Sequence, residues 1–63
     1  MPKTNIKVKL INEDGNAFLI LGKVSQSLKK AGRRDLAEEY MKEARKGDYD
    51  NLLRVTMEYV EII

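Results

Sequence analysis

The sequence predicts a small α+β domain, in which an N-terminal strand is followed by three helices. Residues 5–11 alternate apolar and polar side chains, which is the pattern of a half-buried strand. Residues 17–58 place apolar side chains at helical spacing in three stretches that glycines separate. A chain of 63 residues has room for one hydrophobic core, so we expect a single domain covering residues 1–63.

The expected strand has one apolar face, made by Ile6, Val8 and Leu10. The lysines between them point the other way, and charged side chains on an outer strand protect it from edge-to-edge aggregation. The residues at 12–16 contain Asp-Gly within a polar cluster, which is typical of a turn. We therefore expect the chain to reverse between this strand and the first helix.

The first helix is predicted over residues 17–30, with Asn16 as its N-cap. A single apolar stripe runs along it, made by Ala17, Leu21, Val24, Leu28 and Ala31. Phe18 and Ile20 are expected to widen this stripe. Gly22 lies inside the helix, where glycine costs about 1 kcal/mol relative to alanine, so we expect another backbone to approach it closely. Gly32 is expected to end the helix.

The second helix is predicted over residues 36–46, with Asp35 as its N-cap. Its expected core side chains are Leu36, Ala37, Tyr40, Met41 and Ala44. A third helix is predicted over residues 50–58, and either Asp48 or Asp50 would cap it. Residues 59–63 fit a short strand that pairs with the first strand, which we expect, and they also fit a helix that continues to the last residue.

Four short segments together resemble a group of small bacterial and phage-borne proteins of unknown function. They are Gly15-Asn16-Ala17-Phe18, Leu21-Gly22-Lys23-Val24, Lys30-Ala31-Gly32 and Gly47-Asp48-Tyr49-Asp50-Asn51-Leu52-Leu53. The resemblance covers about residues 5–60, and its most specific part is the Gly-Asp-Tyr-Asp-x-Leu-Leu stretch. It implies a bacterial or phage origin, but it implies no activity, cofactor or partner.

The residue types present exclude several kinds of chemistry. The chain contains neither cysteine nor histidine, so it has no Ser–His or Cys–His catalytic pair, no disulfide and no thiolate or imidazole metal ligand. Asp48 and Asp50 begin like a calcium-binding loop, but the sixth and twelfth positions of that loop are Leu53 and Tyr59. We therefore expect a protein that is not an enzyme and that has no cofactor or metal.

Charge is distributed unevenly along the chain. Residues 1–34 carry eight basic and two acidic side chains, a net charge of +6, whereas residues 35–63 carry four basic and eight acidic ones, a net charge of −4. Such asymmetry indicates either a binding surface or oppositely charged segments that lie side by side in the fold or across a dimer interface. The longest apolar run is Ala17–Leu21, far below the about 20 residues of a membrane span, and we expect a cytoplasmic protein without membrane contact.

The function that the sequence favours is a non-enzymatic protein-interaction module that binds itself or another protein. A thin core and an exposed strand would both gain from a second copy, so we expect a homo-oligomer. The alternative is a small nucleic-acid-binding accessory protein whose basic cluster consists of Lys23, Lys29, Lys30, Arg33 and Arg34. Glu38, Glu39 and Glu43 on the second helix count against this alternative, because a recognition helix is seldom acidic.

Overall fold

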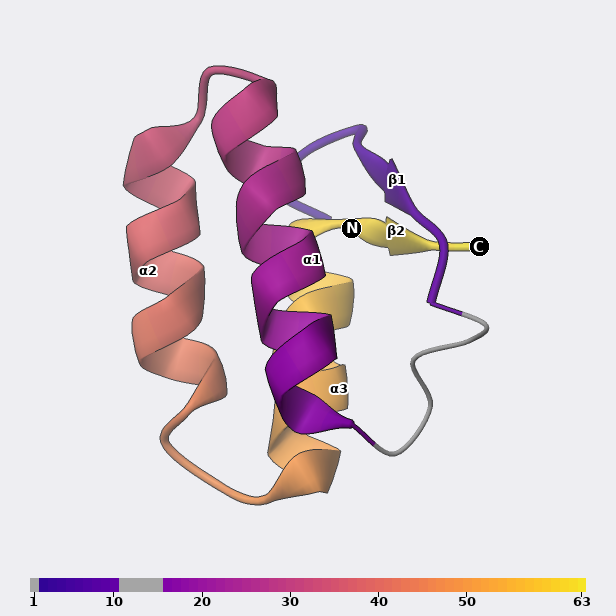
Figure 1. Cartoon of the computed structure of the whole chain (residues 1–63), viewed down its shortest axis with the longest axis vertical. Coiled ribbons are helices and arrows are strands. Elements are labelled where there is room, and N and C mark those ends of the chain that lie inside the picture. Colours follow the sequence, from indigo (N-terminus) through magenta and orange to yellow (C-terminus); the bar gives the residue numbers. More distant parts are fainter. Residues whose placement is uncertain (1, 11–15) are drawn as a thin grey trace.

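A computed structural model describes residues 2–10 and 16–63, which form three helices and a two-stranded sheet (Figure 1). In chain order the elements are β1 (Lys7–Val8), α1 (Ala17–Lys30), α2 (Arg34–Ala44), α3 (Tyr49–Tyr59) and β2 (Glu61–Ile62). The two strands pair in parallel, with Lys7 opposite Glu61 and Val8 opposite Ile62. The predicted α+β fold and the C-terminal strand are therefore confirmed. Most of the predicted turn at 12–16 lies outside the described residues.

The helices α1 and α2 lie side by side and run in opposite directions (Figure 1). The sheet lies on the side of α1 away from α2, and α3 passes behind α1 (Figure 1). The α1–α2 pair thus forms one wall of the domain.

No helix within the described residues has both the length and the apolar character needed to cross a membrane.

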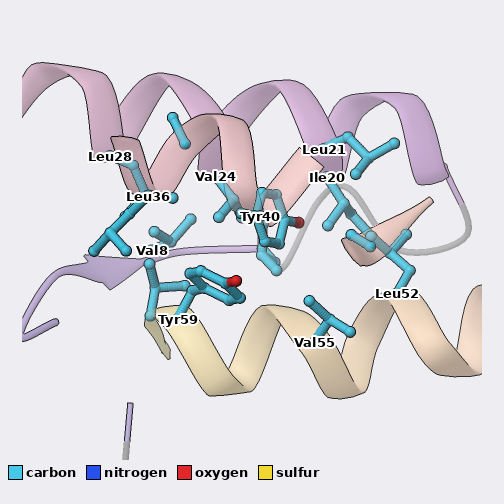
Figure 2. Packing of buried hydrophobic residues seen from close by; sticks show 14 residues of the cluster. Val8, Ile20, Leu21, Val24, Leu28, Leu36, Tyr40, Leu52, Val55 and Tyr59 are labelled. Atoms are coloured by element: carbon cyan, nitrogen blue, oxygen red, sulfur yellow. The ribbon is translucent and has the colours of Figure 1, made fainter. Parts of the chain in front are cut away.

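Buried apolar side chains from all three helices meet inside this arrangement, together with Val8 and Leu10 from the N-terminal segment (Figure 2). The stripe on α1 is confirmed at Leu21, Val24 and Leu28, and Ile20 joins it. Phe18 does not belong to the buried stripe. Its side chain is 87 % exposed, so its prediction as a core residue was wrong. The reason is its position on the flank of α1, where no described element packs over it.

One polar pair lies within the core. The Tyr40 and Thr56 hydroxyls are 2.8 Å apart, and both residues are fully buried. Thr56 already donates its proton to the Leu52 carbonyl at 2.7 Å, so Tyr40 must be the donor to Thr56. The Tyr40 ring also meets the Tyr59 ring edge to face, with centroids 5.5 Å apart. These bonds link α2 to α3 without leaving either hydroxyl unsatisfied.

The ends of α1 follow the sequence prediction closely. The Asn16 side chain accepts a hydrogen bond from the Leu19 amide at 3.2 Å, as an N-cap does. At the other end Gly32 takes a left-handed φ of 79°. The Gly32 amide donates to the Lys29 carbonyl at 3.0 Å, and the Arg33 amide donates to the Leu28 carbonyl at 2.9 Å. These two bonds form a Schellman motif, which turns the chain directly into α2.

The start of α2 differs from the prediction. Asp35 is not the N-cap: the helix begins at Arg34, and the cap is Arg33, which makes no side-chain capping bond. The Schellman motif leaves only Ala31, Gly32 and Arg33 between the two helices, and the Arg33 carbonyl already accepts the first helical bond of α2, from the Ala37 amide, at 3.0 Å. Asp35 instead lies in the first turn, where its negative charge is favourable near the helix N-terminus.

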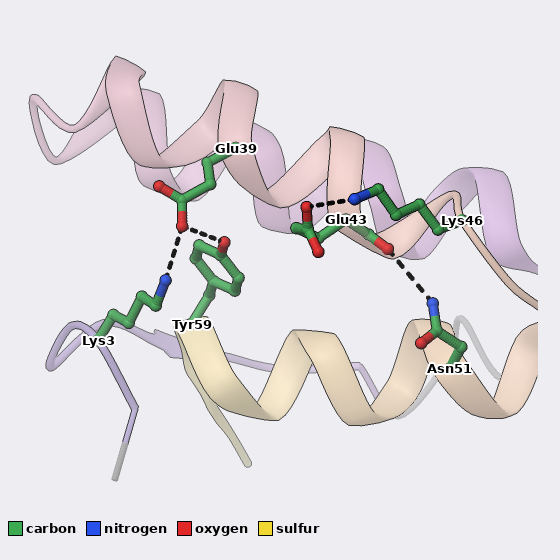
Figure 3. A network of polar contacts seen from close by, with 6 residues as sticks. All are labelled: Lys3, Glu39, Glu43, Lys46, Asn51 and Tyr59. Atoms are coloured by element: carbon green, nitrogen blue, oxygen red, sulfur yellow. Dashed lines mark hydrogen bonds and ion pairs between the residues drawn. The ribbon is translucent and has the colours of Figure 1, made fainter.

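The glycine that permits close packing is not the predicted one. A Cβ on Gly22 would meet nothing within 4 Å, so the expected backbone approach at Gly22 is wrong. A Cβ on Gly47 would come within 2.8 Å of the Asn51 Cβ. Gly47 lies where the chain turns from α2 into α3, and Asn51 reaches back across this turn to the Glu43 carbonyl at 3.3 Å (Figure 3). Of the two candidate N-caps, Asp48 is the cap of α3, since it accepts from the Asn51 amide at 3.0 Å, and Asp50 lies in the first turn.

Candidate functional site

A charged network near the N-terminus joins three parts of the chain (Figure 3). The Glu39 carboxylate on α2 accepts from Lys3 Nζ and from the Tyr59 hydroxyl, each at 2.6 Å on the same oxygen. Lys3 Nζ also lies 4.5 Å from the centre of the Tyr59 ring. The network fastens the N-terminal segment to α2 and α3.

The pKa values of these groups are shifted in the directions that favour their ordinary forms at neutral pH. The hydrogen bond from Lys3 lowers the pKa of Glu39, and the same bond raises the pKa of Lys3. Burial, followed by the bond to Glu39, raises the pKa of Tyr59. A general base needs a pKa near the working pH. Glu39 stays ionised and Lys3 and Tyr59 stay protonated, so the network is best explained as a structural tie.

A groove on the outside of the α1–α2 pair is the stronger candidate site. Two adjoining hollows form it, and they share Ser25, Lys29 and Met41. A third hollow, at the α2–α3 connection, shares Phe18 with this groove. We call the first two hollows together the α1–α2 groove; its lining residues are Phe18, Leu19, Gly22, Lys23, Ser25, Gln26, Lys29, Ala37, Glu38, Met41, Lys42 and Arg45.

The groove has an exposed apolar end. Phe18 is 87 % exposed and Leu19 is 52 % exposed, although both belong to α1. Met41 on α2 is half-buried between the two hollows. Gly22 lies one turn beyond Phe18 and adds no side chain, so the helix backbone itself is accessible there. Phe18, Leu19 and Met41 therefore supply the large apolar side chains of the groove, alongside the polar Ser25 and Gln26.

The sides of the groove are basic. Four of its lining residues are cations and one, Glu38, is an anion, which gives a net charge of +3. Among the described residues, Lys29, Lys42 and Arg45 take part in none of the ion pairs. The other two glutamates of α2 are not among the lining residues: Glu39 pairs with Lys3, and Glu43 pairs with Lys46 at 2.9 Å (Figure 3). The acidic appearance of α2 in the sequence thus comes mainly from residues engaged outside the groove.

The predicted basic cluster is divided by the fold. Lys23 and Lys29 line the groove. Lys30, Arg33 and Arg34 are exposed at the α1–α2 turn, where Arg33 Nε lies 3.6 Å from Asp35.

Sequence reasoning missed the α2 side of the groove, which Met41, Lys42 and Arg45 supply. The available signal was helical spacing: positions 38, 41, 42 and 45 share one helix face. This face was obscured because the glutamates made the whole helix look acidic.

Comparison with known proteins adds no family to this description. No protein-family model matches the chain, and no curated protein or solved structure is significantly similar to it. The resemblance to small bacterial and phage-borne proteins therefore stays an expectation from the sequence.

Proposed function

We propose that this protein is a non-enzymatic interaction module, which binds another protein through the α1–α2 groove. The observation that supports this proposal is the exposure of Phe18 beside Leu19. Burial of a phenylalanine side chain contributes about 1.5–3 kcal/mol, which the fold forgoes at this position. A partner that covers Phe18 would recover that free energy on binding.

The residue types also favour binding over catalysis. The chain has no histidine or cysteine to act as nucleophile or proton acceptor near pH 7. The network of Lys3, Glu39 and Tyr59 has pKa shifts that favour the ordinary charged or neutral form of each group at neutral pH. An exposed apolar surface with a charged border is typical of a site that recognises a protein.

Capture from host cells with matched variants tests the proposal. Phe18→Ser removes the exposed ring of the groove, whereas Met57→Ser removes a 55 % exposed side chain of α3 that does not line the groove. We expect wild type and Met57→Ser to retain the same cross-linked partner and Phe18→Ser to lose it, with all three folded by circular dichroism. A partner that Phe18→Ser retains in full would contradict the proposal.

Nucleic-acid binding is the second candidate function, and the placement of the glutamates favours it. Glu39 and Glu43 are engaged outside the groove, so they do not shield Lys29, Lys30 and Arg34. Phosphate contacts would be strongly salt-dependent and nearly independent of base sequence. Fluorescence anisotropy with duplex and single-stranded DNA at low salt tests this function, and an unchanged signal at micromolar protein would reject it.

Self-association stays a separate proposal, and the small sheet is the surface that it would use. Neither strand pairs with a further strand among the described residues, so both outer edges are open. The accessible surface of the chain is 4417 Å², close to the about 4,200 Å² expected for a folded monomer of this mass. A dimer would therefore add an interface to a core that is already closed. Sedimentation equilibrium measures this, and a strict monomer at high concentration would contradict it.

A further inference from the structure

We infer that the partner in the α1–α2 groove is an acidic amphipathic helix of another protein, seated over Gly22. The inference rests on the proposed interaction function and specifies the chemistry of the partner. It is drawn from the shape of the groove, from the exposed glycine and from the charges along its sides.

The length of the groove matches a short helix. Its α1 side extends from Phe18 to Lys29 and its α2 side from Ala37 to Arg45. At 1.5 Å per residue, residues 18–29 span about 16 Å, which is the length of about three helical turns. Recognition of a helix in such a groove uses apolar side chains spaced i, i+3, i+4 and i+7.

Gly22 is the feature that favours a helix lying close to α1. The glycine destabilises α1 by about 1 kcal/mol relative to alanine. The fold does not use its small size, because a Cβ there would have nothing within 4 Å. The absence of a side chain instead leaves the α1 backbone open in the groove, beside Phe18, Leu19 and Lys23. Small residues at helix crossings allow the two backbones to approach, so a partner helix would benefit where the fold itself does not.

The charges that border the groove determine the sign of the charge expected on the partner. Lys29, Lys42 and Arg45 border the groove without an ion pair among the described residues, and Glu38 is the single acid of the lining. Carboxylates on the flanks of a bound helix would complement them and would exclude basic competitors. A second copy of this chain in a symmetric contact would instead bring the same cations together.

The apolar surface distinguishes a protein partner from a nucleic acid. A phosphate backbone would satisfy Lys29, Lys42 and Arg45, but it would leave Phe18, Leu19 and Met41 uncovered. An amphipathic helix covers both kinds of surface at once. The groove therefore matches the acidic helix better than it matches DNA or RNA.

Selection from a displayed library of helical peptides tests the inference. Every peptide carries an apolar i, i+3, i+4, i+7 stripe, and its flanking positions are randomised among Glu, Lys, Gln and Ala. We expect selected peptides to be rich in Glu at the flanks, and their Kd to rise with salt. Measured by anisotropy, Lys42→Glu together with Arg45→Glu should weaken the best peptide about tenfold or more, since each tenfold corresponds to about 1.4 kcal/mol.

Two further variants distinguish an effect on binding in the groove from an effect on the stability of the fold. Gly22→Leu adds a side chain in the groove at a helical position where an added Cβ would meet nothing within 4 Å, so it should abolish binding while leaving Tm unchanged or higher. Met57→Ser, on α3, should bind as the wild type does.

The outcomes distinguish this inference from the proposed function. Selection of basic or uncharged peptides that still depend on Phe18 would overturn the acidic partner and leave the interaction module intact. Failure of every peptide to bind, or binding that Gly22→Leu does not change, would overturn the helix in the groove. Binding of DNA that the best peptide does not compete away would overturn the choice of a protein over a nucleic acid.

Discussion

The buried hydroxyl pair of Tyr40 and Thr56 allows a quantitative test of the packing between α2 and α3. Thr56→Val keeps the shape of the side chain but leaves the Tyr40 proton without an acceptor in a fully buried place. An orphaned buried donor costs about 1–3 kcal/mol. For a domain of this size the loss corresponds to about 5–20 °C in Tm.

Removal of the donor instead of the acceptor should cost less stability. Tyr40→Phe removes the donor, and Thr56 keeps its bond to the Leu52 carbonyl at 2.7 Å. The expected loss is therefore that of one ordinary hydrogen bond, about 0.5–1.5 kcal/mol. In the double variant no hydroxyl is left unsatisfied, so we expect it to be no less stable than Thr56→Val alone. The two changes should thus be coupled by at least the loss from Tyr40→Phe alone, about 0.5–1.5 kcal/mol.

Urea unfolding of the wild type, both single variants and the double variant, followed by circular dichroism, measures this coupling. A common m-value shows that the four proteins lose the same surface on unfolding, so that their free energies can be compared. If the two single losses simply add in the double variant, the hydroxyls do not act as a pair and the reasoning from burial fails.

Three further predictions concern backbone and charge. Gly22→Ala should raise the free energy of unfolding by about 0.5–1 kcal/mol in denaturant titrations, because the position is helical and open. Gly32→Ala should lower it by about 1–2 kcal/mol, because φ is 79° there; an unchanged midpoint would contradict the Schellman assignment. Lys3 lowers the pKa of Glu39 in the folded state, so the stability from this pair is present above the ordinary carboxyl pKa of 4.5 and is lost as the pH falls through the lowered value. Melting curves against pH should show this acid loss in the wild type and less of it in Glu39→Gln.

Much of the fold could be predicted because its signals are local. The N-cap at Asn16, the turn at Gly32 and the N-cap at Asp48 depend on a few adjacent residues, and all three are confirmed. The stripe of Leu21, Val24 and Leu28 follows from helical spacing alone. Residues 59–63 fitted both a short strand and a continued helix in the sequence. The pairing of β2 with β1 confirms the strand.

The failures concern relations between segments. Periodicity places Phe18 near the core stripe, but whether an element covers it depends on the packing of α2 and α3. The close neighbour of Gly47 is Asn51, whose side chain returns across the α2–α3 turn, and the spacing of residues along the chain does not reveal this contact. The groove was missed for the same reason: its basic side appears only when Glu39 and Glu43 are seen to be engaged elsewhere.

The parallel pairing of the first and last strands has a consequence for the order of folding. Lys7 and Glu61 lie 54 positions apart, so their pairing closes a loop that contains all three helices. Closing so long a loop is entropically unfavourable until the helices have packed and brought its ends together. The strands should therefore assemble last and open first, and in native-state hydrogen exchange the Glu61 and Ile63 amides should lose protection before those in the middle of α1.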